Sequence, residues 1–272
     1  MKKIIKFFSF SMLVVCFILL ILFPLYIMFR ISLGTAQDIF SQQPGYFPEQ
    51  ITVDHFVKVF SSGGVFFGPL RKSIVTGVLA SILSLLIAVP AAYAISRFNY
   101  RLRYSLILAI FLTRMVPEVS IALPVSISFI RMGLFDTVFG LTLAHLIRIL
   151  PISCFILVSV FSGFPAELEN QAMIDGCSRL KAFFKVVMPL CAGGIAVAAI
   201  FSFLLSWDEF IYASYLTLSE PTMPLKMFYY ISRGDIFSSS TYAVVITVPV
   251  LIFTLALQKF IRPDYLSGAI KG

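Results

Sequence analysis

Four ionisable side chains lie inside long apolar stretches of this sequence: Arg114, Glu118, His145 and Arg148. Ionisable groups at membrane depth usually face a bundle interior or a water-filled path rather than lipid. Arg114 and Glu118 are four positions apart, so on a helix they share one face and can pair. These residues either line a path for a hydrophilic solute or form a structural ion pair, and His145 is expected to be a packed or interfacial histidine.

Asp208 and Glu209 follow a later apolar run and would line the same path or lie at the membrane interface. Other chemistry is not indicated. The sequence has no H-E-x-x-H, G-x-S-x-G or G-x-x-x-x-G-K-[ST] motif, so it lacks the residues for a zinc protease, a serine hydrolase or a phosphate-binding loop. We therefore predict that the chain is not an enzyme and holds no cofactor of its own.

The cysteines also speak against a metal or disulfide framework. Their spacing is unpaired, and each lies in an apolar run or in a polar loop: Cys16, Cys154, Cys177 and Cys191. Zinc sites and disulfide-rich domains need regular cysteine pairs. We expect these side chains to serve in packing, with no metal site.

The longest polar stretch of the second half of the chain runs over residues 164–189. Its first part has acids near the start of a predicted helix, where they favour the positive helix end. Gly176 suits the helix end, because glycine adopts left-handed backbone angles without a Cβ clash. In the part after Gly176 the apolar residues lie at helical spacing, so one side of the predicted helix is apolar and the other is basic. A short helix-turn-helix on a membrane face is a suitable surface for a soluble partner.

Composition places these residues in a membrane protein. The 272 residues are 59% hydrophobic and only 12% charged, with a mean hydropathy of +0.97. Soluble domains carry about a quarter charged residues. Runs of about 20 apolar residues span a bilayer. We predict one all-α integral membrane domain over residues 1–272, with six transmembrane helices at about 7–29, 73–96, 104–131, 137–161, 190–212 and 241–259.

The shape of the third span stays open, and the orientation of the chain in the membrane follows from its basic residues. The third span contains Pro117 and Pro124, so it is either one distorted helix or a broken one. Segments 30–72 and 214–240 are predicted to be polar outer loops. The net charge of +8 is read as topology rather than nucleic-acid binding. Lys and Arg are densest before the first span, after the second, in the 164–189 loop and in the tail, which predicts that both termini and this loop are cytoplasmic, although Arg71 and Lys72 go against the rule.

The 164–189 loop resembles the coupling loop of the permease subunits of bacterial ATP-binding-cassette (ABC) importers, whose pattern is E-A-A, three residues, G, nine residues, I-x-L-P. Gly176 and Pro189 keep this spacing, while residues 170–172 read Asn-Gln-Ala at the E-A-A position. Further fragments resemble the carbohydrate-type permeases related to the maltose importer, in the right order along the chain: residues 91–98 (A-Y-A-x-x-R-F), 133–141 with 150–151, 207–210 (W-N-E-F, with Asp208 for Asn) and 267–272.

The resemblance implies a type I permease fold with cytoplasmic coupling helices between the fourth and fifth spans, in the bacterial inner membrane. It implies a second permease subunit, usually a different chain, two ATPase subunits that bind ATP and Mg, and an external solute-binding protein. The expected ATPase-coupling residues are Glu167, Glu169, Asn170, Ala172, Asp175, Gly176 and Lys271. In this reading Ala172 allows close approach, Gly176 sets the angle of the loop, and the acids pair with the ATPase. Simple helix capping is the alternative role for the acids.

Two other classes of function fit the sequence less well. A self-sufficient secondary carrier or channel should have duplicated halves with broken helices at matching positions, which the sequence does not display. A membrane-embedded enzyme should have a catalytic motif, and none of the motifs named above occurs. An importer permease for a sugar or related solute is therefore the predicted function, and the carrier is the alternative.

Overall fold

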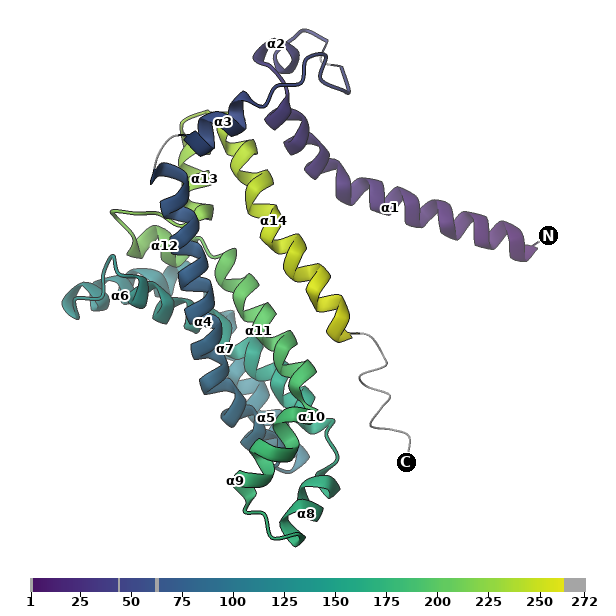
Figure 1. Cartoon of the computed structure of the whole chain (residues 1–272), viewed down its shortest axis with the longest axis vertical. Helices are drawn as coiled ribbons and strands as arrows, with labels where there is room; N and C mark the ends of the chain where they lie inside the picture. Colours follow the sequence, from purple (N-terminus) through teal and green to yellow (C-terminus); the bar gives the residue numbers. More distant parts are fainter. Residues whose placement is uncertain (1, 44, 62–63, 262–272) are drawn as a thin grey trace. The chain divides into compact units, whose positions relative to one another are not determined.

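The computed structural model describes residues 2–43, 45–61 and 64–261, and within these ranges the chain is helical and contains no strand (Figure 1). The helices in chain order are α1 (Lys2–Leu33), α2 (Ala36–Ile39), α3 (Asp54–Ser61), α4 (Gly64–Ser96), α5 (Tyr100–Leu112), α6 (Glu118–Arg131), α7 (Val138–Ser162), α8 (Ala166–Ile174), α9 (Arg179–Ala182), α10 (Met188–Leu190), α11 (Ala192–Trp207), α12 (Ile211–Leu216), α13 (Met223–Ser232) and α14 (Ile236–Ile261).

Four stretches are long and apolar enough to cross a membrane: Phe10–Leu33, Phe66–Ser96, Val138–Ser162 and Ile236–Ala256. Two bent helix pairs raise the number to six if each pair is one span. They are Tyr100–Met115 with Glu118–Arg131, and Arg179–Leu190 with Ala192–Trp207. Counted in this way, the described part of the chain has the predicted six-span plan. The all-α fold class is confirmed.

The third predicted span is the broken one of the two alternatives. Its two helices meet at an angle of 83° around Val116 and Pro117. Val116 is extended, with ψ at 126°, because the ring of the following proline excludes the helical conformation. Pro117 is then the N-cap residue before α6, where its missing N–H breaks no helical hydrogen bond.

The second bend, of 76°, lies between α10 and α11. A π-helical turn over Phe183–Val187 precedes it, and Pro189 follows within the first turn of α10. Proline cannot donate a backbone hydrogen bond, and π-turns widen a helix locally, so both features are recognised causes of a sharp bend. The end of the 164–189 loop therefore leaves the axis of α11.

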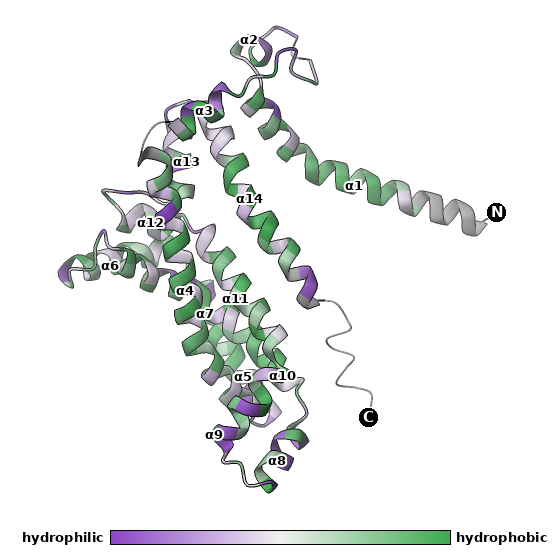
Figure 2. Cartoon of the chain, in the orientation of Figure 1, coloured by the Kyte–Doolittle hydropathy of each residue, from purple (hydrophilic) through white to green (hydrophobic). Residues whose placement is uncertain are grey.

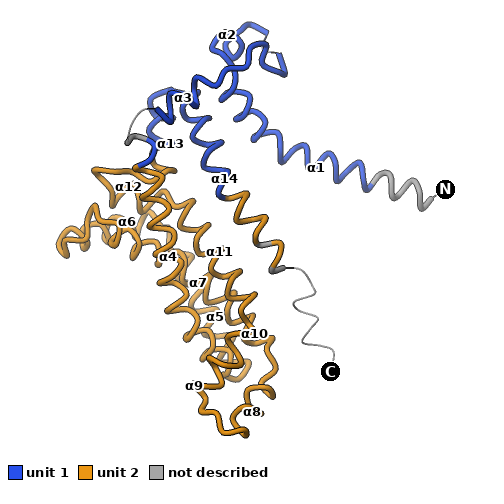
Figure 3. The backbone as a smooth tube through the Cα atoms, in the orientation of Figure 1, with its two compact units in different colours: residues 1–67, 226–249 blue, residues 68–225, 250–272 orange. Residues whose placement is uncertain are grey.

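The chain divides into two compact units (Figure 3). Unit 1 comprises residues 1–67 and 226–249, and unit 2 comprises residues 68–225 and 250–272. In unit 1, aromatic packing joins distant segments: the His55 and Phe237 rings stack at 4.5 Å, and Phe66 packs on Tyr242 at 5.8 Å. Unit 2 contains all the described residues that are predicted to line a path or to couple to the ATPase; Lys271 lies outside the described residues.

The core of unit 2 is formed by α4, α7 and α11, together with the loop between α7 and α11. Its buried residues are Ala88, Val89, Ala92, Cys154, Leu157, Val158, Phe161, Phe164, Phe183, Val187, Cys191 and Ala198. Three serines join the same helices, because Ser153 Oγ lies 3.0 Å from Ser84 Oγ and 2.8 Å from Ser202 Oγ. Hydroxyls of this kind hold helices together where no water competes.

The prediction that residues 214–240 form a loop was wrong. The whole of α13 lies within this segment, and Met223, Pro224 and Leu225 at the start of the helix are buried. Proline is tolerated in the first turn of a helix, since the N–H of that position has no helical partner. Likewise the segment 30–72 contains α2, α3 and the start of α4. Polarity and prolines in these segments therefore did not exclude helices.

Candidate functional site

The predicted coupling loop forms two short helices joined by a tight turn. At the end of α8 the N–H of Cys177 bonds the carbonyl of Ala172 at 3.0 Å, and the N–H of Gly176 bonds that of Met173 at 3.1 Å. This pair of bonds is the Schellman motif, and Gly176 adopts the positive φ of 89° that the motif requires. Ser178 then caps α9 by accepting from the N–H of Lys181. Local sequence signals thus fix the turn.

The surface of this loop is polar with a few exposed apolar side chains. Ile174 is 84% exposed, Leu180 is 68% exposed and Phe184 is 59% exposed. The predicted coupling residues Glu167, Asn170 and Asp175 are also exposed, whereas Ala172 is half-buried. Within unit 2, α8 and α9 lie at the end away from α6 and α12, and they carry hydrophilic residues beside the apolar α4 (Figures 1 and 2). Exposed apolar side chains on a polar element mark a surface that a partner can cover.

Glu169 differs from the other predicted coupling residues because it is buried, with only 4% of its surface exposed. Its Oε2 accepts from Arg97 Nε at 2.9 Å and from Arg97 Nη2 at 2.7 Å. The hydroxyl of Tyr93 donates to its other oxygen. The structure thus gives Glu169 two partners within the chain, at the end of α4. Sequence reasoning missed these partners, Tyr93 in the last turn of α4 and Arg97 directly after the helix.

A second group of charged residues gathers where α6, α7 and the end of α11 meet. Arg114 Nη1 lies 2.9 Å from Glu118 Oε1, so the pair predicted from their spacing is present. Arg148 places Nε 3.8 Å from the same Glu118 oxygen and Nη2 3.8 Å from Asp208 Oδ2. The Asp208 side chain is 83% exposed, and the others are between 19% and 28% exposed. The structure therefore brings together four of the five residues predicted to line a path.

Glu209, the fifth, lies next to this group but has a different environment. Its carboxylate is fully buried and accepts from the N–H groups of Tyr212 at 2.7 Å and Ala213 at 3.0 Å, so it caps α12. His145 Nε2 is 3.1 Å from Glu209 Oε2, and His145 Nδ1 is 2.6 Å from Ser206 Oγ. His145 is a packed histidine, one of the two roles expected for it.

The other end of α4 carries a charged contact that the sequence did not predict. Lys72 is buried, lies 3.6 Å from Asp136 Oδ1 and donates to the carbonyl of Glu220. Burial by itself would raise the pKa of Asp136, but hydrogen bonds from Leu218 N and Ser219, together with the charge of Lys72, lower the pKa below its ordinary value. The buried Lys72 thus has a carboxylate partner, as a buried charge requires.

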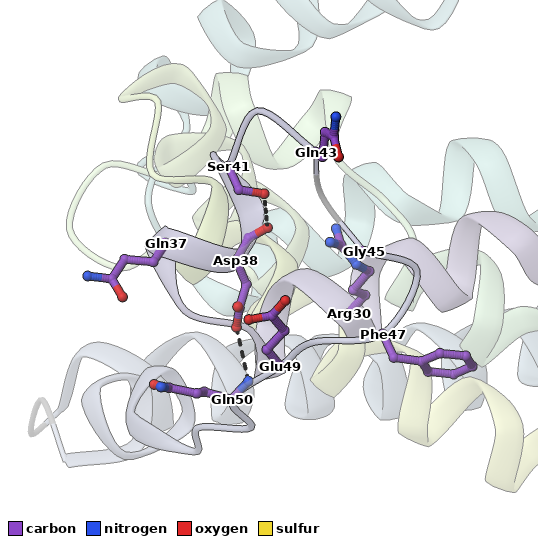
Figure 4. Close-up of a pocket in the computed structure, with 9 residues that line it drawn as sticks. All are labelled: Arg30, Gln37, Asp38, Ser41, Gln43, Gly45, Phe47, Glu49 and Gln50. Carbon is purple, nitrogen blue, oxygen red and sulfur yellow. Dashed lines mark hydrogen bonds between the residues drawn. The ribbon is translucent and has the colours of Figure 1, made fainter.

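A small polar pocket of about 190 Å³ lies in the segment after α1 (Figure 4). Asp38 ties the ends of this segment together, because its Oδ2 accepts from Thr35 Oγ1 at 3.0 Å and from the N–H of Gln50 at 3.2 Å. The other lining side chains are Arg30, Gln37, Ser41, Gln43, Phe47 and Glu49. The pocket belongs to unit 1 and is separate from the residues predicted to line a path.

Within the described ranges, no group of His, Cys, Asp and Glu side chains is placed to hold a metal ion. The cysteines Cys16, Cys154, Cys177 and Cys191 are all free. Two of them, Cys154 and Cys191, belong to the apolar core of unit 2, as expected for packing residues.

A bundle of apolar spans with a polar helix-turn-helix between its fourth and fifth spans defines a membrane permease component. The chain belongs to the family described as the inner membrane component of binding-protein-dependent transport systems, whose model matches residues 61–266. The chain is therefore a multi-pass inner-membrane transport component, and the resemblance to ABC importer permeases is confirmed.

Individual relatives agree with this assignment. The chain is 32% identical over 256 residues to the sulfoquinovosyl glycerol transport system permease protein SmoH of Agrobacterium fabrum, covering 92% of this chain and 89% of the relative. It is 31% identical over 257 residues to the trehalose transport system permease protein SugB of Mycobacterium tuberculosis, covering 92% and 93%. Among solved structures, a chain of a bacterial ABC transporter involved in alginate import matches with a TM-score of 0.77 at 20% identity, over 96% of this chain and 98% of that chain. At 20% identity, this structural match supports the fold alone.

Proposed function

We propose that this chain is the membrane-spanning subunit of an ABC importer for a sugar or related solute. It forms half of the translocation path with a second permease subunit. Two partner ATPase subunits bind its coupling loop and hydrolyse ATP with Mg, and an external binding protein delivers the solute. The family description supports the binding-protein partner, and relatives named for trehalose and sulfoquinovosyl glycerol support the carbohydrate class.

The observation that carries this proposal is the exposed apolar surface of the coupling loop. Ile174, Leu180 and Phe184 are more than half exposed on an element whose other exposed residues are mostly polar. Burying one such side chain against a partner contributes about 1.5–3 kcal/mol. Glu167 and Asp175 lie beside them and offer ion pairs to a basic rim of the ATPase surface. Gly176 gives the loop the shape in which these side chains are presented together.

The loop and both termini lie in the cytoplasm in this proposal. Arg97 and Arg103 are near the loop, with Arg103 Nη1 3.1 Å from Ser162 Oγ, and α9 adds Arg179 and Lys181. This concentration of basic residues at one end of unit 2 supports the cytoplasmic assignment of that end. Lys72, toward the opposite end of α4, is paired with Asp136 and remains an exception to this rule.

Arg114, Glu118, Arg148 and Asp208 line part of the solute path in this proposal. Two guanidinium groups and two carboxylates balance in charge, which suits a solute rich in hydroxyl groups and without a strong charge of its own. Paired charges also offer both donors and acceptors, which sugar hydroxyls need. Glu209 is left out of the path because its carboxylate caps α12.

The test is whether the ATPase subunits stay bound when the apolar surface is made acidic. Ile174→Asp and Leu180→Asp are each expected to lose the ATPase subunits during purification of the complex, while the chain still inserts in the membrane. Leu218→Asp is the matched control, because Leu218 is 80% exposed on a segment outside the coupling loop. Full retention of the ATPase by both loop variants would refute the coupling role, and loss in the control as well would point to misfolding.

The carrier alternative is separated from this proposal by the energy source. Membrane vesicles that contain the complete complex are expected to take up solute when supplied with ATP and binding protein, and to stop when ATP is withheld. Uptake that follows an imposed ion gradient without ATP would identify a secondary carrier instead.

A further inference from the structure

The coupling helix α8 places one charged side chain in the interior of unit 2. Every residue of α8 is described, and Glu169 is its one buried side chain. Pro165, which precedes the helix, makes no side-chain capping bond. The acids Glu167 and Asp175 point to solvent. The contact of Glu169 with the end of α4 therefore determines how α8 is held against the bundle.

Arg97 connects three elements at this contact. Its Nε and Nη2 bond Glu169 of α8, and its Nη1 donates to the carbonyl of Phe161, near the end of α7, at 3.1 Å. A guanidinium that bonds one carboxylate through two N–H groups fixes orientation as well as distance. The position of α8 relative to α4 and α7 is thus defined by directional bonds, whereas apolar contacts alone would allow sliding.

Tyr93 extends the contact to the other side of the loop. Its hydroxyl bonds Glu169, its ring lies 4.9 Å from Arg97 Cζ, and its centroid is 4.5 Å from that of Phe183 in the π-helical turn. The Phe161 ring packs on the same tyrosine at 5.9 Å. Both ends of the coupling loop are thus packed against α4, a helix to which the loop is not covalently joined.

We propose that Tyr93, Arg97 and Glu169, here called the Glu169 anchor, are positioning residues that make α4 move together with the coupling helix. This inference rests on the proposed function, because it concerns how motion of an ATPase reaches the bundle. Covalent connection alone would pass that motion to α7 and α11. The Glu169 anchor adds α4, so three helices of unit 2 shift as one body when the loop is displaced. Breaking a buried, multiply bonded ion pair in every cycle would be costly, so the anchor stays closed.

The experiment uses the complete transporter reconstituted in proteoliposomes, with ATP hydrolysis and solute uptake measured on the same sample. Glu169→Gln and Arg97→Gln are expected to raise the ATP hydrolysed per solute by about fivefold or more, the lower end of usual coupling between sites. The reason is that the ATPase still binds and displaces α8, but this displacement no longer moves α4. Arg101→Gln is the matched control for Arg97→Gln, since it removes the same charge from an exposed position of the neighbouring helix α5, and its ratio should equal that of wild type.

Two further variants separate a positioning role from simple stability. Because the two residues act through one bond set, the double variant Arg97→Gln/Glu169→Gln should uncouple no more than either single variant. Arg97→Lys keeps the charge that membrane insertion needs but loses the two-pronged bond, so it should give an intermediate ratio even if the neutral variants accumulate poorly. A ratio equal to wild type in all variants, with uptake and hydrolysis falling in proportion, would overturn the inference. If instead wild-type ATPase fails to associate with the chain, the proposed function fails and not the anchor.

Discussion

Gly176 allows the coupling loop to be perturbed through the backbone alone. Its φ is +89°, and a Cβ built at this position would meet no atom within 4 Å. A substitution therefore costs only the left-handed conformation, about 1–2 kcal/mol for an L-residue. Asparagine tolerates this conformation better than alanine. Proline cannot adopt it, and it also removes the N–H that bonds Met173, which makes the cost about 3 kcal/mol or more.

The expected order of ATP-driven uptake in proteoliposomes is wild type, then Gly176→Asn, then Gly176→Ala, with Gly176→Pro nearly inactive. A cost of 1–2 kcal/mol moves the equilibrium between this turn and other loop conformations by about 5- to 30-fold. Uptake is measured per inserted transporter, so lower expression does not enter the result. The amount of ATPase bound to each variant, measured on the purified complex, should fall in the same order.

The chain contains matched controls. Gly133 ends α6 with the same pair of bonds, from Leu134 N to Phe129 O and from Gly133 N to Ile130 O, and its φ is +68°. Gly133→Ala should lower the thermal unfolding midpoint as much as Gly176→Ala does but retain the ATPase. Equal uptake by Gly176→Ala and wild type, or equal loss of ATPase in both alanine variants, would refute the assignment of the turn to coupling.

Three other outcomes are expected from the packing. Gly194→Ala places a Cβ 2.4 Å from a methyl carbon of Val160, so it should destabilise the chain by about 1–3 kcal/mol. The Cβ of Gly193→Ala meets no atom within 4 Å, so this variant should be neutral or slightly stabilising. Both effects are measured by thermal unfolding, and equal effects would contradict the close contact between the helices. Asp136→Asn leaves the buried Lys72 without its carboxylate and should cost about 3–5 kcal/mol in a denaturation experiment; a cost below about 1 kcal/mol, the level of exposed pairs, would argue against the pair. The pKa of Asp136 is lowered in the folded chain, so its carboxylate stabilises the fold fully at pH values above its ordinary pKa of 3.8. This stabilisation is lost as the pH falls through the lower pKa of the folded chain, so the stability difference between wild type and Asp136→Asn should shrink in acid. A difference that stays constant down to acid pH would contradict this.

Much of the fold could be predicted because the signals are local. Apolar runs of spanning length need no knowledge of neighbours, and they gave the six-span plan once each bent pair is counted as one span. The turn at Gly176 follows from the conformation that only glycine adopts easily. The spacing of Arg114 and Glu118 likewise predicts a pair, and the pair is formed, although it joins the two sides of the bend at Val116 and Pro117 rather than one face of a single helix. Prolines misled the prediction over 214–240, where the effect of Pro224 depends on its position in the helix.

Local sequence signals could not predict the contacts between segments that are far apart in the chain. The sequence by itself determined which stretches cross the membrane, which loop is polar and where that loop turns, because backbone preference and hydrophobicity act within a few residues. Only the tertiary structure decided that Glu169 turns inward to Arg97, 72 residues away, while Glu167 on the same helix stays in water. Both are acids on one short helix, and packing against α4 alone distinguishes them. The same holds for Lys72, whose charge is neutralised by an aspartate that no local pattern connects to it.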